Sequence, residues 1–436
     1  MLKRFTVENF SSFQKENILD LTAGKTKAHS EHIVEFEKVN ILKSAAIYGA
    51  NASGKSNLVK SIDYAKKIIL KDLNNVDTYK KYFRLDKDSL NQSTVFEFEF
   101  ELNSRFFSYG FSSILNTQNI SEEWLYEIGK SLPEMIFERK SNDISLGELL
   151  IKNHDIKNRF EIYRDDMKNQ SHQLFLSEIA SKNLEIEEIQ IINTIYNWFA
   201  EKLLILYPNT KFGKKSFIST DKELSQIFKK YLNEFDTGII DIESIEEDFE
   251  ISLKEFPEEI KKEIAKAILK EEIQFSIIQG INGVFTIFKD THDELKVQKL
   301  GLIHGKDIKE IFELKDESDG TKRLFDLIPL IGKFSQDYTI IIDEFERSLH
   351  PKLTKKFFEL FYKFKNSKTQ LIVTTHESNL IDLDLMRKDE IWFLEKDKNG
   401  SSKIFSLNQF QVRTDNEIEK AYLFGRYGAI PIFKTS

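Results

Sequence analysis

Residues 49–56 read Gly-Ala-Asn-Ala-Ser-Gly-Lys-Ser, and this run constrains the fold more than any other part of the chain. It has the pattern of a glycine followed by any four residues and then Gly-Lys-Ser. This pattern is typical of a loop whose backbone N–H groups surround a phosphate. The apolar residues 45–48 precede it and predict a strand. Apolar residues at helical spacing follow it, namely Leu58, Ile62, Ala65 and Ile69. The sequence therefore predicts a strand, a phosphate-binding loop and a helix in succession, as in α/β proteins.

The residue types of this loop suit a nucleotide bound with Mg²⁺. Gly49 and Gly54 let the backbone approach the phosphates closely, and the N-terminus of the helix attracts negative charge. Lys55 would reach the β- and γ-phosphates, and the Ser56 hydroxyl would be a ligand of Mg²⁺. The alternative is an ordinary glycine turn into a helix, which the flanking strand and helix disfavour. We therefore predict an ATP site formed by Gly49, Ala50, Asn51, Ala52, Ser53, Gly54, Lys55, Ser56 and Asn57.

A second part of such a site is predicted where residues 338–343 form a buried strand that ends in a carboxylate. Asp343 would hold Mg²⁺, and Glu344, one residue further out, would polarise the water that attacks the γ-phosphate. An apolar run followed by Asp-Glu is, on its own, more often a simple strand end. Here a predicted helix follows, and after it a strand at 371–375 that ends in His376. Such a strand–helix–strand unit would bring His376 to the same sheet edge, in contact with the γ-phosphate.

Residues 317–323 read Glu-Ser-Asp-Gly-Thr-Lys-Arg and lead into an apolar helix at 324–334. Ser318 can cap that helix and offer its hydroxyl, while Gly320 allows a close approach of the backbone. A simple capped helix is the alternative interpretation. The position of the segment before the acidic strand favours a second phosphate-binding surface, made by Ser318, Asp319, Gly320 and Thr321.

This ordered series resembles the ABC-type ATPase heads of the RecF, SMC and SbcC class, and more closely the AAA-15/AAA-21 ATPases of bacterial anti-phage systems of the AbiL type. The segments that carry the resemblance are 5–13, 49–58, 122–126, 317–330, 340–351, 374–378 and 425–431. The resemblance implies that Ser318–Thr321 cap the ATP of a partner subunit, in a homodimer or higher homo-oligomer that closes around two nucleotides. It also implies that Ser348–Pro351 form a loop of the same interface. Asp319 departs from the commoner glycine at its position.

We expect an α/β fold, a P-loop NTPase of the ABC-type head class with two lobes, a mixed sheet and an inserted helical region. Residues 1–140 would form the first lobe, because runs such as 94–102 alternate in the manner of half-buried strands. Charged sequence with a helical period then predicts a helical insertion at 141–274. Strand signals return after it, and residues 275–436 would form the second lobe, with alternating strands and helices.

Composition limits the class of protein. The absence of cysteine excludes disulfides and thiolate metal sites, which fits a reducing cytoplasm. Lysine and arginine number 63 against 71 aspartate and glutamate, a formal net charge of -8, so any contact with nucleic acid must be local. No run of about 18 apolar residues predicts a membrane span. We expect a cytoplasmic protein with no membrane partner.

We expect a Mg²⁺-dependent ATPase with Lys55, Glu344 and His376 as its catalytic residues. The resemblance implies the sensor or regulatory subunit of an anti-phage system similar to abortive infection. A phage-derived trigger and a separate effector, a nuclease or toxin, would be its partners, because no room is left after His376 for the Toprim nuclease domain of related lysogenization-defect nucleases. The alternative is a RecF- or SbcC-like DNA-maintenance clamp, which would bind DNA in a salt-sensitive way. An importer or exporter ATPase would need a membrane partner, and the large helical insertion argues against it.

Overall fold

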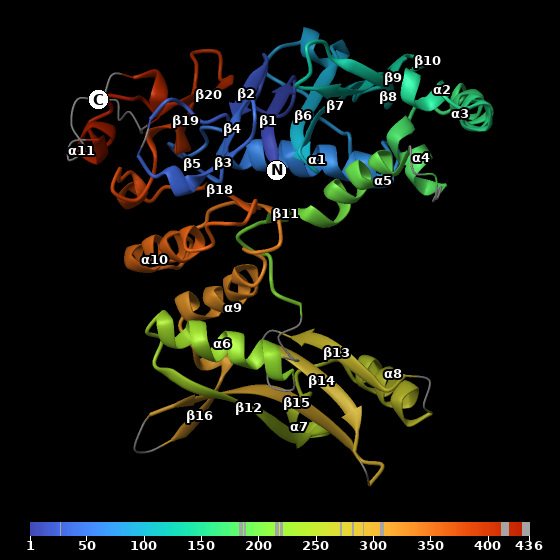
Figure 1. Ribbon diagram of the computed structural model, residues 1–436. Helices are drawn as coiled ribbons and strands as arrows, with labels where there is room; N and C mark the ends of the chain where they lie inside the picture. Colours follow the sequence, from blue (N-terminus) through green and yellow to red (C-terminus); the bar gives the residue numbers. More distant parts are fainter. Residues whose placement is uncertain are drawn as a thin grey trace. The chain divides into compact units, whose positions relative to one another are not determined.

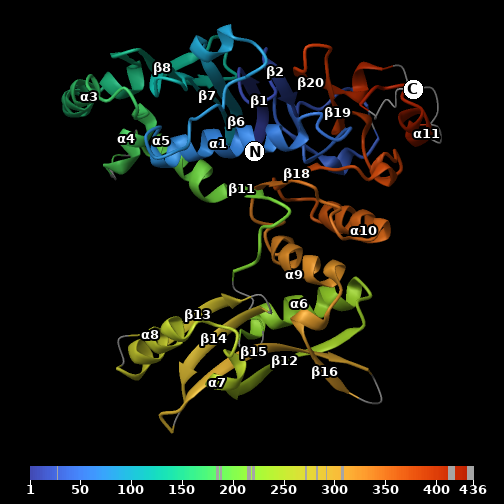
Figure 2. The same cartoon turned by 180° about the vertical axis from the view of Figure 1, so that it is seen from behind.

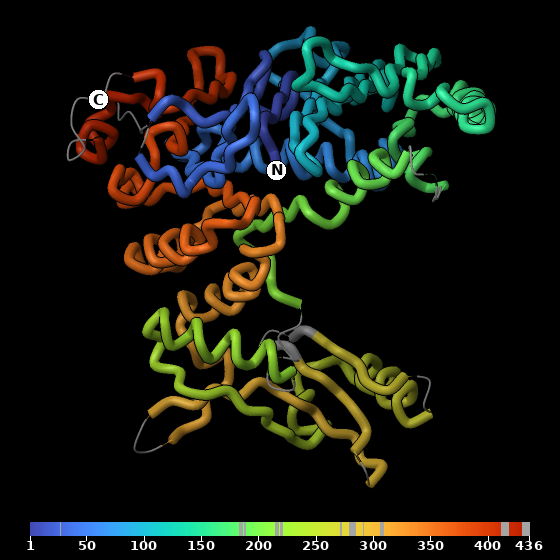
Figure 3. The backbone as a smooth tube through the Cα atoms, viewed as in Figure 1, coloured from blue at the N-terminus to red at the C-terminus, as the bar shows by residue number. Residues whose placement is uncertain are grey.

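The computed structural model describes residues 1–26, 28–182, 186, 189–213, 218, 221–270, 273–280, 283–290, 292–305, 309–410 and 418–429. The chain forms two compact units, whose elements Figure 1 labels. The first unit consists of Met1–Pro208, Phe334–Glu346 and Phe357–Ser436, and the second of Asn209–Lys333 and Arg347–Lys356. Figure 3 traces the chain through both units by residue number.

A seven-stranded antiparallel sheet makes up one part of the first unit, in the order β10-β9-β8-β7-β6-β1-β2. In β6, phenylalanine alternates with glutamate, and Phe96, Phe98 and Phe100 are buried, as the period of two predicts. The strands are β1 Leu2–Glu8, β2 Asn17–Asp20, β6 Thr94–Leu102, β7 Arg105–Ile114, β8 Asn119–Ile128, β9 Glu134–Lys140 and β10 Asp143–Leu146. A separate hairpin pairs β3 Ile33–Glu35 with β4 Asn40–Leu42.

A six-stranded sheet carries the predicted site, in the order β11-β17-β18-β5-β19-β20. All of its pairings are parallel except that of β19 with β20. Every residue of β5, β17 and β18 is buried, as expected for central parallel strands covered on both faces. Because parallel strands end at a common edge, the loops after these three strands meet there. The bounds are β5 Ser44–Gly49, β11 Leu203–Leu206, β17 Thr339–Ile342, β18 Gln370–Thr374, β19 Ile391–Lys396 and β20 Ser402–Ser406.

Helix α1, Lys55–Lys71, joins the two sheets of the first unit into one core. Figures 1 and 2 show it from opposite sides, lying along the strands. The four residues predicted to face inward are almost fully buried, namely Leu58, Ile62, Ala65 and Ile69. The same apolar cluster contains Phe96 of β6 and Ile47 of β5. Further helices are α2 Glu148–Ile151, α3 His154–Met167, α4 Phe175–Ser181, α5 Gln190–Asn197 and α11 Ile418–Leu423. The residues of α10 Pro351–Tyr362 are divided, those up to Lys356 belonging to the second unit and those from Phe357 to the first.

The second unit is built on a five-stranded antiparallel sheet, in the order β12-β15-β14-β13 with β16 also paired to β15. Its strands are β12 Ile239–Asp248, β13 Phe275–Gly280, β14 Gly283–Lys289, β15 Leu295–His304 and β16 Glu310–Glu313. Its helices are α6 Lys222–Glu234, α7 Phe249–Ser252, α8 Glu258–Leu269 and α9 Asp319–Ile331. A small core of Phe249, Leu253, Ile268, Phe285, Ile287 and Val297 holds the sheet to α7 and α8.

The compact units differ from the expected division at residues 140 and 274. Side chains from Leu150 to Leu203 pack into the core of the first unit, so this stretch is not an insertion separate from it. Within the insertion expected to be helical, residues 203–206 form β11, which pairs in parallel with β17. The second unit contains a sheet, and β12 lies inside the range expected to be helical. Short apolar runs such as Leu203–Leu206 do not distinguish helix from strand, and the pairing partner decides.

The described helices are all too short or too polar to cross a membrane. Of the C-terminal segment 425–431, Gly425 has a φ of 75° and follows α11, as expected of a glycine that ends a helix. Residues 430 and 431 lie outside the described residues.

Candidate nucleotide site

The loop between β5 and α1 has the backbone shape that phosphate binding requires. Gly54 precedes the first turn of α1 with a φ of 117°, a conformation that favours glycine. A Cβ atom on Gly49 would lie 2.5 Å from the carbonyl oxygen of Leu394, so this position also requires glycine. No side chain caps α1, and its first N–H groups therefore remain available to an anion.

Lys55 lies folded back over this loop. Its Nζ donates to the carbonyl oxygens of Gly49 (2.7 Å) and Ala50 (3.2 Å), and the residue is 6% exposed. Burial lowers the pKa of Lys55 to about 8, although the carboxylates of Glu346, Asp343 and Glu344 oppose the shift. The ammonium is thus held at the mouth of the loop. Burial disfavours its positive charge, and a bound phosphate would stabilise that charge again.

The lowered pKa of Lys55 predicts a pH dependence of ATP affinity. Bound phosphates favour the ammonium and raise its pKa, so above pH 8 binding takes up a proton. Affinity should therefore fall by up to about tenfold for each pH unit above 8. Calorimetric titrations at pH 7, 8 and 9 measure this slope. In the Lys55→Arg control the guanidinium keeps its charge, and the slope should disappear. An identical slope in both proteins would exclude Lys55 as its source.

Asp343 directly follows β17 and is 3% exposed. Its Oδ1 accepts hydrogen bonds from Ser56 Oγ (3.2 Å) and Thr374 Oγ1 (2.6 Å). Two adjacent ligands of octahedral Mg²⁺, each about 2.1 Å from the ion, lie about 3.0 Å apart. The hydroxyl of Ser56 and the carboxylate of Asp343 thus fit Mg²⁺ in spacing and in chemistry, as the sequence predicts.

Two further carboxylates follow Asp343 on the same loop. Glu344 has a left-handed backbone (φ 48°), and its N–H donates to Thr374 Oγ1 at 2.9 Å. Sequence reasoning missed Glu346, whose Oε1 accepts from the His376 N–H at 2.6 Å. Its Oε2 is buried with no hydrogen-bond partner among the described residues. Glu346 also opposes the lowering of the Lys55 pKa more than the other carboxylates do. The sequence did offer one signal for Glu346: it lies two residues after Glu344, on the same loop after a buried strand.

His376 follows β18 and lies at the same edge of the sheet. Its Nδ1 is 3.5 Å from Lys55 Nζ. Its pKa is lowered, because the site partly desolvates the ring and the Lys55 ammonium is close. The imidazole is therefore neutral at pH 7 and can donate one N–H to a phosphate oxygen.

The wall of the loop includes two serines that the sequence did not single out as site residues. Ser402 Oγ donates to the Ser53 carbonyl oxygen (2.6 Å) and lies within hydrogen-bond distance of Ser12 Oγ (2.8 Å), which accepts from Asn57 Nδ2 (2.9 Å). Ser12 and Asn57 line a cleft of about 920 Å³ next to the loop. The charged residues of this cleft are Lys60, Asp63, Lys67, Lys80, Lys81, Arg84 and Lys396. The excess of cations suits a phosphorylated ligand.

The predicted second phosphate-binding segment belongs to the second unit, whereas the loop 49–56 belongs to the first. Ser318 is the N-cap of α9, and its Oγ accepts from the Thr321 N–H at 3.1 Å, which confirms the predicted cap. A Cβ atom on Gly320 would lie 2.8 Å from the Ser348 carbonyl oxygen. Asp319 is the first residue of the helix. The segment therefore lies beside the loop that begins at Ser348.

The chain is similar to a known protein family and to solved structures. Residues 44–382 match the family AAA_21, described as "AAA domain, putative AbiEii toxin, Type IV TA system". No curated protein matches the chain. Among solved structures, the SMC head domain from Thermotoga maritima is 13% identical with a TM-score of 0.38, and the match covers 94% of this chain and 99% of that one. An SMC head bound to the C-winged helix domain of ScpA is also 13% identical, with a TM-score of 0.39 and coverage of 94% and 98%.

Proposed function

The chain belongs to the AAA_21 family of ATPase domains, and from this premise we propose that it binds and hydrolyses ATP with Mg²⁺ where β5, β17 and β18 end. The proposal rests on one observation, that residues from three separate segments of the chain meet at this edge of the sheet. The adjacent residues Lys55 and Ser56 each contact another segment: Lys55 Nζ lies 3.5 Å from His376 Nδ1, and Ser56 Oγ donates to Asp343 Oδ1 at 3.2 Å. Phosphate released from ATP, measured with Mg²⁺ and with a chelator in its place, tests it.

Different residues would bind the phosphates, hold Mg²⁺ and transfer the proton. The N–H groups of the loop and Lys55 bind the phosphates, and the excess of cations in the cleft beside Asn57 attracts the negatively charged nucleotide. Ser56 and Asp343 hold Mg²⁺, which offsets the negative charge that develops during phosphoryl transfer. Glu344 accepts a proton from the attacking water, and His376 donates to the γ-phosphate.

We further propose that the catalytic assembly is a dimer, in which Ser318–Thr321 of one subunit cap the ATP bound to the loop of the other. The chemistry of the N-terminus of α9 supports this proposal. The capped N-terminus of α9 presents N–H groups and a hydroxyl, and Gly320 leaves the backbone accessible. The loop 49–56 already binds the phosphates of the nucleotide in its own subunit. A second phosphate-binding surface would therefore serve the nucleotide of the partner subunit.

Mixed dimers test this arrangement. Lys55→Ala removes the loop lysine and Ser318→Arg blocks the capping surface, so each variant alone should be inactive. A mixed dimer contains one site with neither change, and an equal mixture should recover about a quarter of wild-type turnover if subunits exchange freely. Recovery no greater than in either variant alone would contradict shared sites. Because Ser318→Arg also removes the cap of α9, at a cost of about 1 kcal/mol, its melting temperature must be checked first.

For the biological role, we propose a regulatory ATPase of an anti-phage system that controls a separate effector. The family description connects such domains with a toxin and a toxin–antitoxin system. Copurification with the product of a neighbouring gene, and a change in that partner's activity when ATP is added, would support this role. Salt-sensitive binding to DNA without a protein partner would favour a DNA-maintenance clamp instead.

A further inference from the structure

Three potential metal ligands gather in the first unit outside the nucleotide site. His29, Glu31 and His32 lie on a short 3₁₀ turn, Ser30–His32, just before β3. Glu31 Oε1 is 3.9 Å from His29 Nδ1 and 4.0 Å from His32 Nε2. One ligand atom from each of the three residues lies within 4.8 Å of the other two. The distances to Glu31 are too long for hydrogen bonds, and the two imidazole rings are stacked, with their centres 4.7 Å apart and their planes 19° from parallel.

The outer nitrogen of each imidazole is already engaged. His29 Nε2 is 2.7 Å from the carbonyl oxygen of Leu383. A carbonyl can only accept, so Nε2 carries the hydrogen and Nδ1 of the neutral ring keeps its lone pair. His32 Nδ1 is 3.0 Å from Glu390 Oε2, which also accepts from the Arg387 N–H at 2.6 Å. Nδ1 of His32 therefore donates, and Nε2 keeps the lone pair. Both free lone pairs are on the nitrogens nearest to Glu31.

Hydrogen bonds from the outer nitrogens to a carboxylate and to a backbone carbonyl are the arrangement seen around metal-binding histidines. Such bonds select the tautomer and orient the ring. His32 and Glu390 are buried, and the His32 ring stacks on Tyr362 with the ring centres 3.4 Å apart. His29 and Glu31 are 20% and 37% exposed in their side chains. The site is thus rigid on one side and open to solvent on the other.

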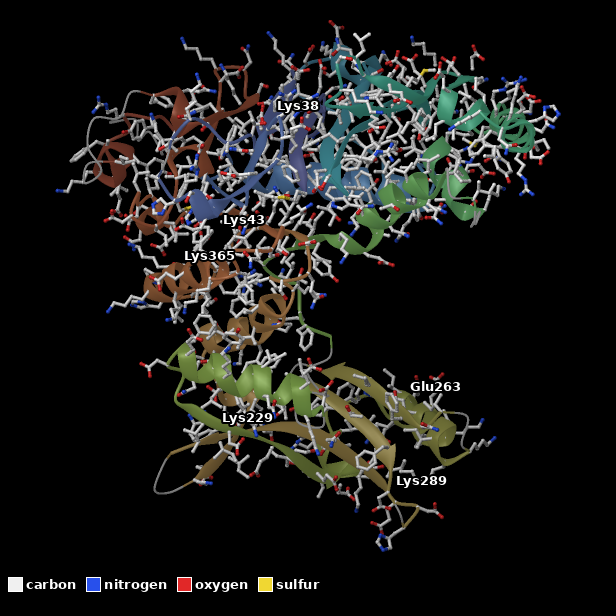
Figure 4. The ribbon with its side chains drawn as sticks, in the orientation of Figure 1. Lys38, Lys43, Lys229, Glu263, Lys289 and Lys365 are labelled. Carbon is white, nitrogen blue, oxygen red and sulfur yellow. The ribbon has the colours of Figure 1, made fainter. Side chains whose placement is uncertain are left out.

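The backbone around the three residues is also held in place. The Lys43 N–H donates to the carbonyl oxygen of His32 at 2.8 Å. The side chain of Lys43 donates to the carbonyl oxygens of Phe364 (3.2 Å) and Lys365 (2.6 Å), and Figure 4 labels Lys43 and Lys365.

We propose that His29 Nδ1, Glu31 Oε1 and His32 Nε2 bind one divalent transition metal of the zinc type, with a fourth position left to water. Two imidazoles and one carboxylate suit Zn²⁺, whereas Mg²⁺ and Ca²⁺ prefer oxygen ligands. With tetrahedral geometry and bonds of about 2.0 Å, the ligand atoms would lie about 3.3 Å apart. The ligand atoms now lie up to 4.8 Å apart, so the side chains would need to approach by about 0.6 to 1.5 Å. The His29 ring would also need to turn out of its stack on His32, and the partly exposed His29 and Glu31 can make this shift.

The position of the site suggests a structural role. Glu390, which orients His32, accepts a hydrogen bond from Ser44 Oγ at 2.7 Å. Ser44 begins β5, and the phosphate-binding loop follows the other end of that strand. A bound metal would therefore fasten the segment before β3 to the sheet at the edge opposite the nucleotide. It should stabilise the fold and leave the chemistry of ATP unchanged.

Zinc titration of the full-length protein, after removal of metal with a chelator, tests the proposal. Wild-type protein should bind one equivalent of Zn²⁺, and a hundredfold excess over the dissociation constant should raise the melting temperature by about 3 °C. Co²⁺ bound in its place should show the strong visible absorption of four-coordinate geometry. His29→Gln and Glu31→Gln, both at partly exposed positions, should weaken binding by roughly a hundredfold or more and still fold.

The matched control is His292→Gln. His292 Nδ1 also lies 4.0 Å from a carboxylate, that of Asp290, but its side chain is 83% exposed. This variant should bind zinc as the wild type does. Zinc binding that is absent from the wild type, or that is equal in wild type, His29→Gln and Glu31→Gln, would overturn the proposal.

Discussion

Replacing Lys55 with alanine should abolish ATP turnover. The ammonium lies at the mouth of the phosphate-binding loop, held by the carbonyl oxygens of Gly49 and Ala50. Phosphates would draw it from these carbonyls, and it would neutralise charge both in the bound nucleotide and in the transition state. Alanine loses both contributions in a partly buried place where water replaces them poorly. We expect turnover to fall by roughly a thousandfold or more, and ATP affinity to fall with it.

The release of phosphate from ATP under saturating Mg²⁺ measures this effect, and a direct binding titration separates affinity from turnover. Lys71→Ala is the matched control, because Lys71 is an exposed lysine at the other end of α1. It should leave both quantities within twofold of the wild type. A Lys55→Ala protein with wild-type turnover and affinity would show that the loop is not the nucleotide site.

Replacing Glu344 with glutamine should separate ATP binding from hydrolysis. The amide keeps the size of the side chain and much of its hydrogen bonding but cannot take a proton from water. Ser56 and Asp343 would still hold Mg²⁺, since their contact does not involve Glu344. Turnover should fall by roughly a hundredfold or more, whereas ATP affinity should stay within a few-fold of the wild type.

Glu346→Gln is the variant to compare with Glu344→Gln, because Glu346 is the other carboxylate on this loop. Its amide oxygen can still accept from the His376 N–H, so the hydrogen bond at 2.6 Å is retained. We expect turnover to fall by less than about tenfold, mainly through the loss of a negative charge near Lys55. If Glu346→Gln loses turnover and Glu344→Gln keeps it, the proton acceptor is Glu346. If both keep wild-type turnover, neither carboxylate has the role and His376 is the next candidate.

The site residues that sequence reasoning selected and the structure brings together belong to local patterns at strand ends. Gly49, Lys55 and Ser56 belong to one loop, and Asp343 and His376 each follow a fully buried strand. The parallel topology alone then brings their loops to one edge of the sheet. The resemblance to AAA-21 ATPases rested on other segments, 122–126, 317–330 and 425–431, and the match over residues 44–382 confirms it.

What the sequence could not predict depends on contacts between distant segments. Ser12 and Ser402 are 390 residues apart, and neither stands in a motif that indicates their hydrogen bond. β11 is a strand only because β17 is available as its partner. Strand β12 of the second unit was missed for a similar reason, since its partner β15 lies about fifty residues later. In such cases tertiary pairing overrides local periodicity.

The central claim is that two chains close around two ATP molecules, and the molar mass of the Glu344→Gln protein in solution tests it most directly. Light scattering should give the mass of one chain without nucleotide. With saturating ATP and Mg²⁺ it should give twice that mass, with one ATP retained per chain. The matched double variant Lys55→Ala/Glu344→Gln should remain at the mass of one chain under both conditions. A Glu344→Gln protein that retains ATP and still has the mass of one chain would contradict the account.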